Sequence, residues 1–448
     1  MSRCDEKGAL LTYKTNEHRS WDFFEYFAWL SMIKMFPFNV LSRSIDAYQS
    51  NPGAIHVAPL NHVVNLREKM KITNIKAFPI SYRVPEGENV RLGIGLAVKR
   101  DAVLIKVETS EGVTGWGESH HGRCPGAIAK LIDTTIKELV VGMDALDNVG
   151  VWDKIYRMQL ASHGMGYAST MALSGLDLAL WDIKGQALNR PLFEILGGSR
   201  KNIPAYAGGI ALGWQEPAAL AEEAMAHLAR GYKAIKLRVG DNVRADSDRV
   251  EKVRECVGDD VDILVDANTG YSLGQVRKIM PLLEDLDVGW LEEPFPAMDF
   301  HNYRLAATYG GVPIAAGENH FTRYEFARLI EDAAVSYAQP DLSKTGGMTE
   351  AIRIAALTSA WKIPIHPHTS LTGINMAASI HLLSAIDNGG YFEGDVTRYN
   401  PFRDDMGQRP FNISGEGFVS ALEEPGIGIT INEKFLAKYP LIEGPCYV

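Results

Sequence analysis

Cysteine is scarce in this chain of 448 residues, which carries Cys4, Cys124, Cys256 and Cys446. The four stand far apart and form no C-x-x-C pair, so they predict reduced thiols and not a disulfide framework. The same spacing predicts neither a zinc site nor an iron–sulfur cluster. Reduced thiols in a chain of this size are typical of an intracellular protein, and we expect a cytoplasmic location.

Long apolar segments are also missing. The run 26–41 is apolar, but a lysine and a proline interrupt it and it is too short to span a bilayer comfortably. Acidic residues stand near the start, where a secretory signal would be basic. We therefore expect no membrane partner and interpret residues 1–69 as an N-terminal extension that is nonessential or disordered. A membrane or partner anchor is the alternative interpretation.

A surplus of basic residues is absent as well. The chain has 45 Lys and Arg against 55 Asp and Glu, which gives a net charge of −10, and its pI is near 5.7. This balance argues against nucleic acid as the main partner. The hydrophobic fraction of 46% and the charged fraction of 22% are those of an ordinary globular protein. Because the length exceeds what one core usually organises, we expect a large domain and a smaller one.

Three acidic residues recur at an even spacing in the second half of the chain. Asp266, Glu292 and Glu318 stand 26 positions apart, and a short apolar run precedes each of them. A step of this size holds one strand, one helix and two loops, which predicts three acids at the carboxyl ends of successive parallel strands. Converging carboxylates repel one another, and a divalent cation that prefers oxygen ligands relieves the repulsion. Isolated helix caps or surface acids are the alternative.

Apolar periodicity divides the chain after residue 69 into three parts. Residues 70–199 start with strand-like segments and continue with helical segments at 128–141 and 169–188, which indicates an α+β domain. Residues 200–396 alternate strands and amphipathic helices, an α/β pattern that predicts a parallel barrel. We expect residues 397–448 to return to the first domain. The predicted barrel strands are 203–208, 234–239, 262–267, 288–292, 313–317, 335–340, 363–368 and 390–394.

Candidate catalytic residues lie at the ends of the predicted strands. Lys236 and Arg238 are two positions apart and share a strand face, where two cations beside a metal would bind a carboxylate. Arginine stays protonated at any working pH, so Arg238 is a poor proton acceptor. His368 has a prospective partner in Asp341, a pairing that fixes the imidazole tautomer and raises its basicity. Solvated lysines and a structural histidine are the alternatives.

Taken in this order, these motifs resemble those of the enolase superfamily, and within it the mandelate racemase subgroup, over about residues 70–448. The resemblance implies a modified TIM barrel, (β/α)7β, with an α+β capping domain. It implies that Asp266, Glu292 and Glu318 hold Mg²⁺ and that Asp341 and His368 form a catalytic dyad beside Lys236. Glu393 looks like the acid that the family carries on the eighth strand.

The sequence leaves two choices at these motifs. Glu292 and Glu293 face opposite ways on a strand, so only one is expected to bind the metal, and the resemblance favours Glu292. The racemase pattern has Lys-x-Lys where this chain has Lys236-Leu-Arg238. Because the second lysine is a base in that pattern, Arg238 puts in doubt a racemase with one base on each face of the substrate.

Polar segments at 84–100 and 117–123 resemble the cap loops that close over the pocket and select the substrate in this family. Solvated loops without a ligand role are the alternative. A hydrophilic lid suits a polyhydroxylated acid better than an aromatic one. His366 shares a strand face with His368 and is either structural or substrate-binding. The candidate substrate contacts are Asn268, His366, Arg91, His120 and Arg123.

The leading functional hypothesis is an acid-sugar dehydratase, a lyase that removes the proton α to a carboxylate and expels the β-hydroxyl group. The product is a 2-keto-3-deoxy acid, the substrate is a small carboxylate, and Mg²⁺ is the cofactor. A racemase, epimerase or cycloisomerase that uses the same enediolate is one alternative, and a noncatalytic acid-binding barrel is another. The resemblance also implies a homo-oligomer.

Overall fold

The computed structural model describes residues 70–369 and 371–448, so the interpretation of residues 1–69 lies outside the described residues. The described chain starts with an antiparallel sheet in the order β1 (Ile72–Arg83), β4 (Lys99–Thr109) and β5 (Thr114–Ser119). Between β1 and β4, a small hairpin pairs β2 (Arg91–Leu92) with β3 (Gly95–Leu96).

Helices cover one face of this sheet and complete the capping domain. The long helix α7 packs closely on β5 because both carry glycines where the backbones meet. A Cβ atom at Gly117 would lie 1.9 Å from the carbonyl oxygen of Gly175, so no larger residue fits there. The helices are α4 (Pro125–Leu131), α5 (Lys137–Val140), α6 (Asn148–Ile155), α7 (Tyr167–Leu188) and α8 (Leu192–Ile195), with π-helical turns after α4 and α6.

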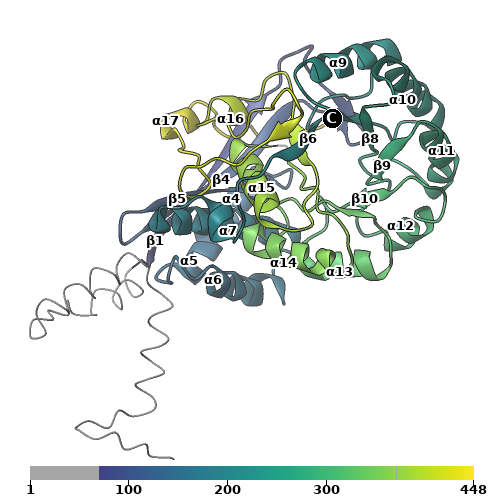
Figure 1. Cartoon of the computed structure of the whole chain (residues 1–448). Coiled ribbons are helices and arrows are strands. Elements are labelled where there is room, and N and C mark those ends of the chain that lie inside the picture. Colours follow the sequence, from purple (N-terminus) through teal and green to yellow (C-terminus); the bar gives the residue numbers. More distant parts are fainter. Residues whose placement is uncertain (1–69, 370) are drawn as a thin grey trace, which may run out of the picture. The chain divides into compact units, whose positions relative to one another are not determined.

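A parallel barrel follows, and its strands alternate with helices that form the outer ring in Figure 1. The strands are β6 (Ile203–Gly208), β7 (Ala234–Arg238), β8 (Asp262–Asp266), β9 (Val288–Glu292), β10 (Ile314–Ala316), β11 (Tyr337–Ala338) and β12 (Phe392–Asp395). The helices are α9 (Pro217–Ala229), α10 (Val243–Val257), α11 (Leu273–Asp285), α12 (Phe300–Ala306), α13 (Thr322–Glu331), α14 (Gly347–Ser359) and α15 (Gly373–Ala385).

The parallel strands have the order β11-β10-β9-β8-β7-β6-β12. Ile365 closes the ring, because it forms parallel bridges to Ala338 at the end of β11 and to Gly389 just before β12. With Ile365 as the seventh strand position, the architecture is (β/α)7β, and the predicted fold class is confirmed. The predicted strand 363–368 shrinks to the single bridging residue Ile365 because Pro364 and Pro367 lack the N–H groups that a ladder needs.

The outer and inner faces of the barrel strands pack against different kinds of side chain. Mainly aliphatic side chains, with some aromatic rings, fill the layer between strands and helices. Inside the barrel, an aromatic cluster surrounds Trp290, whose ring centroid lies 5.6 Å from that of Tyr206, 5.5 Å from Tyr337 and 5.0 Å from His366. This cluster fills the barrel interior, so a ligand site has room only toward the strand ends.

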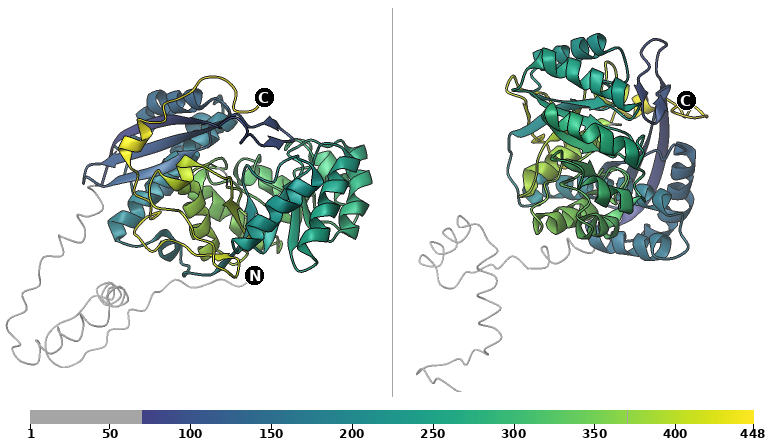
Figure 2. Two further views of the ribbon diagram at one scale, coloured as in Figure 1. Left: turned by 90° about the horizontal axis from the view of Figure 1, so that it is seen from above. Right: turned by 90° about the vertical axis from the view of Figure 1, so that its right-hand side faces the viewer.

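The C-terminal residues contact both parts of the described chain. The segment contains α16 (Pro401–Asp404), β13 (Phe418–Val419), which pairs with β6, and α17 (Glu433–Leu436). Further along, the amide of Ser81 donates to the Tyr439 carbonyl at 3.2 Å, and that of Val98 to the Cys446 carbonyl at 2.9 Å. Figure 2 shows the cap sheet beside the barrel, with the final residues along the cap.

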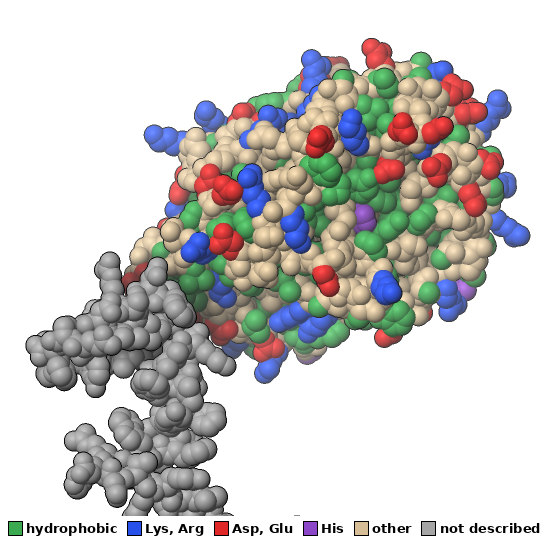
Figure 3. Space-filling model, viewed as in Figure 1, with side chains coloured by type: hydrophobic (Ala, Val, Ile, Leu, Met, Phe, Trp, Pro, Cys, Tyr) green, Lys and Arg blue, Asp and Glu red, His purple; other side chains and the backbone are tan. Residues whose placement is uncertain are grey.

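Two surface properties complete the description. No helix within residues 70–369 and 371–448 is long and apolar enough to cross a membrane. On the face drawn in Figure 3, lysine and arginine side chains are interspersed with aspartate and glutamate side chains over the part that the structure describes. This mixed pattern differs from the basic stripe that a nucleic acid would require.

Candidate active site

The side chains predicted to carry chemistry meet where the barrel strands end. Lys236 and Arg238 come from β7, whereas Asp266 and Glu292 end β8 and β9. Glu318, Asp341 and His368 follow the next three strand positions, and Glu393 lies on β12. A cavity of about 100 Å³ opens above them between the barrel and the cap. Its walls include Arg238, Glu318, Lys344 and His368.

Lys236 is fully buried among carboxylates. Its Nζ atom lies 2.6 Å from Oε1 of Glu292, 3.1 Å from Oε1 of Glu393 and 3.7 Å from Oδ2 of Asp266. Burial lowers the pKa of Lys236, but Glu292 and Glu393 outweigh burial and raise that pKa well above its ordinary value. The ammonium group therefore stays charged.

Arg238 lies in the wall of the cavity with its guanidinium group held from two sides. Nη1 contacts Oδ2 of Asp266, and Nη2 donates to the carbonyl of Gly209. Burial lowers the pKa of Arg238, but the carboxylates of Asp266 and Glu393 outweigh this effect and raise it. A permanently charged group in this position can bind an anion but cannot accept a proton.

Glu292 and Glu293 are both buried. This differs from the sequence expectation that their side chains face opposite ways on a strand. Glu292 accepts hydrogen bonds from the Trp290 indole at 3.1 Å and the Gln339 amide at 2.7 Å. Glu293 lines the cavity and accepts from Nδ2 of Asn319 at 2.7 Å. The strand ends at Glu292, and Glu293 has a φ of +37°, so the strand alternation no longer applies to its side chain.

Burial and repulsion disfavour the charged forms of the two neighbouring glutamates at the end of β9. Burial raises the pKa of Glu292 to about 7, with further repulsion from Asp266, Glu393 and Glu318 that Lys236 only partly offsets. Burial also raises the pKa of Glu293 well above its ordinary value, and Glu318 adds to this effect. Oxygen donors from successive strands with unrelieved repulsion fit a hard divalent cation such as Mg²⁺.

His368 and Asp341 form a close pair, with Nδ1 of His368 2.7 Å from Oδ2 of Asp341. The other oxygen of Asp341 accepts from the amide of Ser343 at 2.7 Å and from Nδ2 of Asn375 at 3.0 Å. These donors hold the carboxylate in place. The carboxylate accepts the proton on Nδ1, so Nε2 faces the cavity. Nε2 lies 2.9 Å from Oε2 of Glu318.

The charges around His368 favour the imidazolium form in this arrangement. Burial lowers the pKa of His368, but Glu318, Glu393 and Asp341 outweigh burial and raise it to about 10. Burial raises the pKa of Glu318, but His368 and Lys344 outweigh it, so this pKa falls well below its ordinary value. The proton on Nε2 is therefore coupled to the Glu318 charge.

Three of the five predicted substrate contacts line the cavity: Asn268, His120 and Arg123. His120 stacks on His121 at 4.2 Å between ring centroids, and the Arg123 guanidinium lies 5.5 Å from the ring centre of Tyr447. His120 and Arg123 form the cap side of the cavity, whereas Asn268 follows β8 on the barrel side.

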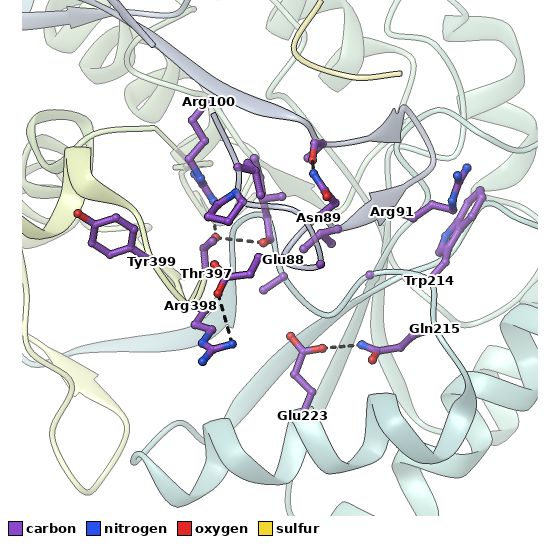
Figure 4. Close-up of a pocket in the computed structure, with 18 of the residues that line it drawn as sticks. Glu88, Asn89, Arg91, Arg100, Trp214, Gln215, Glu223, Thr397, Arg398 and Tyr399 are labelled. Carbon is purple, nitrogen blue, oxygen red and sulfur yellow. Dashed lines mark hydrogen bonds and ion pairs between the residues drawn. The ribbon is translucent and has the colours of Figure 1, made fainter. Parts of the chain in front are cut away.

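Arg91 lies elsewhere. It is exposed and lines a separate cleft of about 270 Å³, where Figure 4 shows its side chain near Trp214. The same cleft contains the ion pair of Arg398 with Glu88, 3.4 Å apart. The expectation that Arg91 contacts the substrate does not hold in this structure, because the β2–β3 hairpin directs Leu92 and not Arg91 into the catalytic cavity.

His366 also lies outside the cavity. Its ring packs within 5.0 Å of Tyr337 and within 5.9 Å of Tyr391 in the aromatic cluster, and Nδ1 accepts the amide N–H of Tyr391 at 2.9 Å. Burial lowers the pKa of His366 to about 3, so the ring is neutral. This position corrects the substrate-binding interpretation. His366 precedes His368 by two residues and therefore points deeper into the barrel.

Sequence reasoning missed several residues that line the cavity. His121 stands beside a chosen residue and Lys344 follows Asp341 by three positions, so both were detectable. The Nζ atom of Lys344 lies 3.5 Å from Oε1 of Glu318. Burial lowers the pKa of Lys344, but Glu318, Asp341 and Glu293 outweigh burial and raise it. Tyr447 had no local signal, because only the return of the C-terminal segment brings it to the cavity.

Comparisons with known proteins agree with this geometry. Residues 79–197 match the mandelate racemase / muconate lactonizing enzyme N-terminal domain, and residues 219–435 match the enolase C-terminal domain-like family. An arabinonate dehydratase of Saccharolobus solfataricus is 32% identical over 372 residues, which are 82% of this chain and 99% of the relative.

Two solved structures are similar over most of this chain. A member of the enolase superfamily from Polaromonas sp. JS666 is 55% identical, with a TM-score of 0.83 and coverage of 85% of this chain and 100% of that one. A racemase from Streptomyces coelicolor with bound magnesium is 28% identical, with a TM-score of 0.75 and coverage of 83% and 100%. The chain belongs to the enolase superfamily, in its mandelate racemase-like branch, and is an enzyme.

Proposed function

We propose that this chain is an Mg²⁺-dependent acid-sugar dehydratase. It removes the proton α to a carboxylate, eliminates the β-hydroxyl group and yields a 2-keto-3-deoxy acid. The observation that carries this proposal is the His368–Asp341 pair, whose imidazole Nε2 faces a cavity with buried cations on its floor. The similarity to an arabinonate dehydratase supports the same reaction class.

Asp266, Glu292 and Glu318 would hold the metal ion. When bound, Mg²⁺ would neutralise negative charge that develops on the substrate carboxylate. Arg238 provides a fixed positive charge in the cavity wall, and Lys236 provides a second one beneath it. Both cations stabilise the enediolate that forms when the α-carbon loses its proton.

His368 performs both proton transfers in this proposal. Neutral Nε2 accepts the α-proton, and the electron pair of the C–H bond moves into the enediolate. The resulting imidazolium returns a proton to the β-hydroxyl group, the C–O bond breaks, water leaves and an enol remains. The enol tautomerises to the 2-keto acid. One imidazole suffices because the proton it gains is the one it next donates.

The charge state of His368 depends on Glu318. In the structure, Glu318 holds the His368 pKa near 10 through the contact at Nε2. Use of this carboxylate as a metal ligand would remove its charge from Nε2, and the imidazole pKa would fall toward the working range of a general base.

The polar lining of the cavity favours a hydrophilic substrate. Arg123, His120 and Asn268 offer hydrogen-bond donors around the space above His368. A polyhydroxylated acid can use these donors, whereas an aromatic acid would leave them without partners. Arg123 is a candidate partner for a second carboxylate at the far end of a diacid.

The decisive experiment is a screen of the purified enzyme with Mg²⁺ against aldonic and aldaric acids in D₂O. Formation of 2-keto acid with deuterium at C3 is the expected result, and His368→Asn is the matched control that should remove it. Exchange of the α-proton without loss of water would instead indicate an epimerase, racemase or cycloisomerase. Tight binding of an acid with neither exchange nor turnover would indicate a noncatalytic barrel.

A further inference from the structure

The cap wall of the catalytic cavity carries hydrogen-bond donors and no carboxylate. Of the described residues that line the cavity, those on the cap side are Leu92, Ile94, His120, His121, Arg123 and Tyr447. The two carboxylates that line it, Glu293 and Glu318, follow β9 and β10 on the barrel side. A ligand group that meets the cap wall must therefore supply the hydrogen-bond acceptors itself.

The two histidines of this wall are fixed as hydrogen-bond donors. Nδ1 of His120 accepts the amide N–H of Gly122 at 3.1 Å, and Nδ1 of His121 accepts that of Arg123 at 2.9 Å. Burial lowers the pKa of His121 to about 3 and that of His120 well below its ordinary value, so both rings are neutral. A neutral ring whose Nδ1 accepts a proton carries its own proton on Nε2. Each imidazole therefore offers one N–H group to a ligand.

The turn after β5 holds these rings in place. Gly122 has a φ of +54° and Arg123 a φ of +61°, and with these left-handed conformations the two amides meet the rings. The amide of His120 donates to the carbonyl of Ser343 at 3.0 Å, on the loop that follows Asp341. A left-handed φ is unfavourable for a residue other than glycine and often marks a functional site. The donors thus keep a fixed position relative to the catalytic dyad.

Arg123 adds a positive charge that no carboxylate of the described residues offsets. Within residues 70–369 and 371–448 its guanidinium group forms no ion pair and no hydrogen bond, and it lies 5.5 Å from the ring centre of Tyr447. A carboxylate oxygen of Asp101 lies within 4.8 Å of a His121 nitrogen, but Lys99 Nζ lies 3.1 Å from Oδ2 of Asp101 and balances its charge. The cap wall is therefore suited to an anion.

We propose that His120, His121 and Arg123 bind a second carboxylate of the substrate, so that the enzyme acts on a dicarboxylic acid sugar, an aldarate. This inference rests on the proposed dehydration, in which Lys236, Arg238 and the metal ion act on the carboxylate beside the reacting carbon. Those two cations belong to the barrel strand β7, whereas the second subsite follows the cap strand β5. A carboxylate has about four acceptor positions, which suit two imidazole N–H groups and a guanidinium fork.

An aldonic acid would place a hydroxyl group at this subsite instead. A hydroxyl oxygen can accept a hydrogen bond from these donors, but it brings no negative charge to the guanidinium group of Arg123. Its own proton would find no carboxylate in the cap wall. Hydrogen bonds between ionised partners are roughly twice as strong as those between neutral partners. The subsite should therefore discriminate between an aldarate and the aldonate of the same configuration.

The test compares aldarates and aldonates in such matched pairs, with Mg²⁺ present. We expect kcat/KM of the wild type to be at least about tenfold higher for the aldarate, as the loss of one charged hydrogen bond would give. Arg123→Gln removes the charge, and His120→Phe removes the donor but keeps an aromatic ring against His121. Each should reduce the aldarate-to-aldonate ratio about tenfold. Lys130→Gln, which removes an exposed charge on α4, is the control and should leave the ratio unchanged.

His368→Asn separates this inference from the proposed reaction. The variant should stop turnover, and calorimetry with Mg²⁺ then gives the dissociation constants of the same pairs. If the enzyme does not dehydrate acid sugars, no 2-keto acid forms, but the ratio of dissociation constants still tests the subsite. If aldonates are dehydrated as efficiently as aldarates, the reaction stands and the second-carboxylate subsite is overturned.

Two further outcomes would also overturn the inference. One is an aldarate preference that survives both Arg123→Gln and His120→Phe, with circular dichroism showing that each variant is folded. The other is failure of every aldarate to bind to His368→Asn in the presence of Mg²⁺. A preference for aldarates that depends on both side chains would support it in either assay.

Discussion

Nδ1 of His368 lies 2.7 Å from Oδ2 of Asp341, and both side chains are buried at the edge of the cavity. The carboxylate stabilises the imidazolium form, as its contribution to the raised pKa of His368 shows. The pair therefore determines both the direction in which the imidazole points and the pH at which it changes charge.

Replacing Asp341 with Asn should lower kcat by about 10² to 10⁴, the usual contribution of a positioned acid–base group. Loss of the carboxylate removes a contribution that raises the pKa of His368, so this pKa should fall. The limb of the pH–rate profile that reports His368 should move to lower pH. Steady-state kinetics across pH provide the measurement. His301→Asn, a change of an exposed histidine, is the control and should leave the profile unchanged.

Replacing Glu318 with Gln should weaken Mg²⁺ binding by more than about 100-fold. Loss of a residue that only supports a metal ligand lowers metal affinity by about 10- to 100-fold, and loss of a ligand itself should cost more. Isothermal titration calorimetry measures the affinity, and Glu331→Gln, an exposed change on α13, is the control. Glu292→Gln should show a similar loss. If Glu293→Gln shows the loss and Glu292→Gln does not, the metal ligand on β9 has been assigned to the wrong glutamate.

Replacing Arg123 with Ala should raise KM for an aldarate about tenfold or more, because a charge-assisted hydrogen bond of about 1.5–3 kcal/mol would be lost. Arg91→Ala is the matched control, since Arg91 lines the separate cleft. It should leave KM within about twofold of the wild-type value. Equal effects of the two changes would contradict the assignment of the catalytic cavity to the Arg123 side.

Replacing Glu118 with Gln should change how stability depends on pH. Glu118 is buried and accepts hydrogen bonds from the Thr372 hydroxyl and the Asn375 amide. Burial raises its pKa from 4.5 to about 8, so the folded chain keeps a proton that the unfolded chain releases between these values. The contribution of Glu118 to stability is complete below pH 4.5 and is lost as pH rises toward 8.

The substituted glutamine side chain would stay neutral at every pH. The free energy of unfolding of Glu118→Gln, minus that of the wild type, should therefore rise as pH increases from 4.5 toward 8. The slope is at most about 1.4 kcal/mol per pH unit. Urea denaturation at pH 5, 7 and 8.5 measures the difference. Glu111→Gln, at an exposed turn, is the control. A constant difference from pH 5 to 8.5 would show that Glu118 is ionised in the folded state.

The sequence predicted the barrel well because its main signal is local. Short apolar runs before Asp266, Glu292 and Glu318 mark the strand ends, and the even spacing reflects the repeating βα unit. The side chains at these ends converge through the barrel geometry alone. The pairing of His368 with Asp341 follows in the same way, because their strand positions are neighbours in the barrel.

The sequence pattern could not predict features that depend on a single backbone angle or on contacts with a distant segment. The φ of +37° at Glu293 ends the strand alternation, and no local motif announces it. The orientation of the β2–β3 hairpin decides which of its residues reaches the catalytic cavity. It places Leu92 there and Arg91 in the separate cleft. Tyr447 and Cys446 reach the cap only through the return of the C-terminal segment, which forms backbone pairs with β3 and β4.

The indole N–H of Trp290 donates to Oε2 of Glu292 at 3.1 Å, inside the aromatic cluster of the barrel. This contact makes Trp290 a built-in optical reporter of the proposed metal ligand, because a change in charge at Glu292 alters the electric field on the indole ring. Addition of Mg²⁺ should shift the tryptophan emission, and Trp290→Phe should remove the shift although the chain carries seven other tryptophans. Metal occupancy could then be followed without substrate or added label.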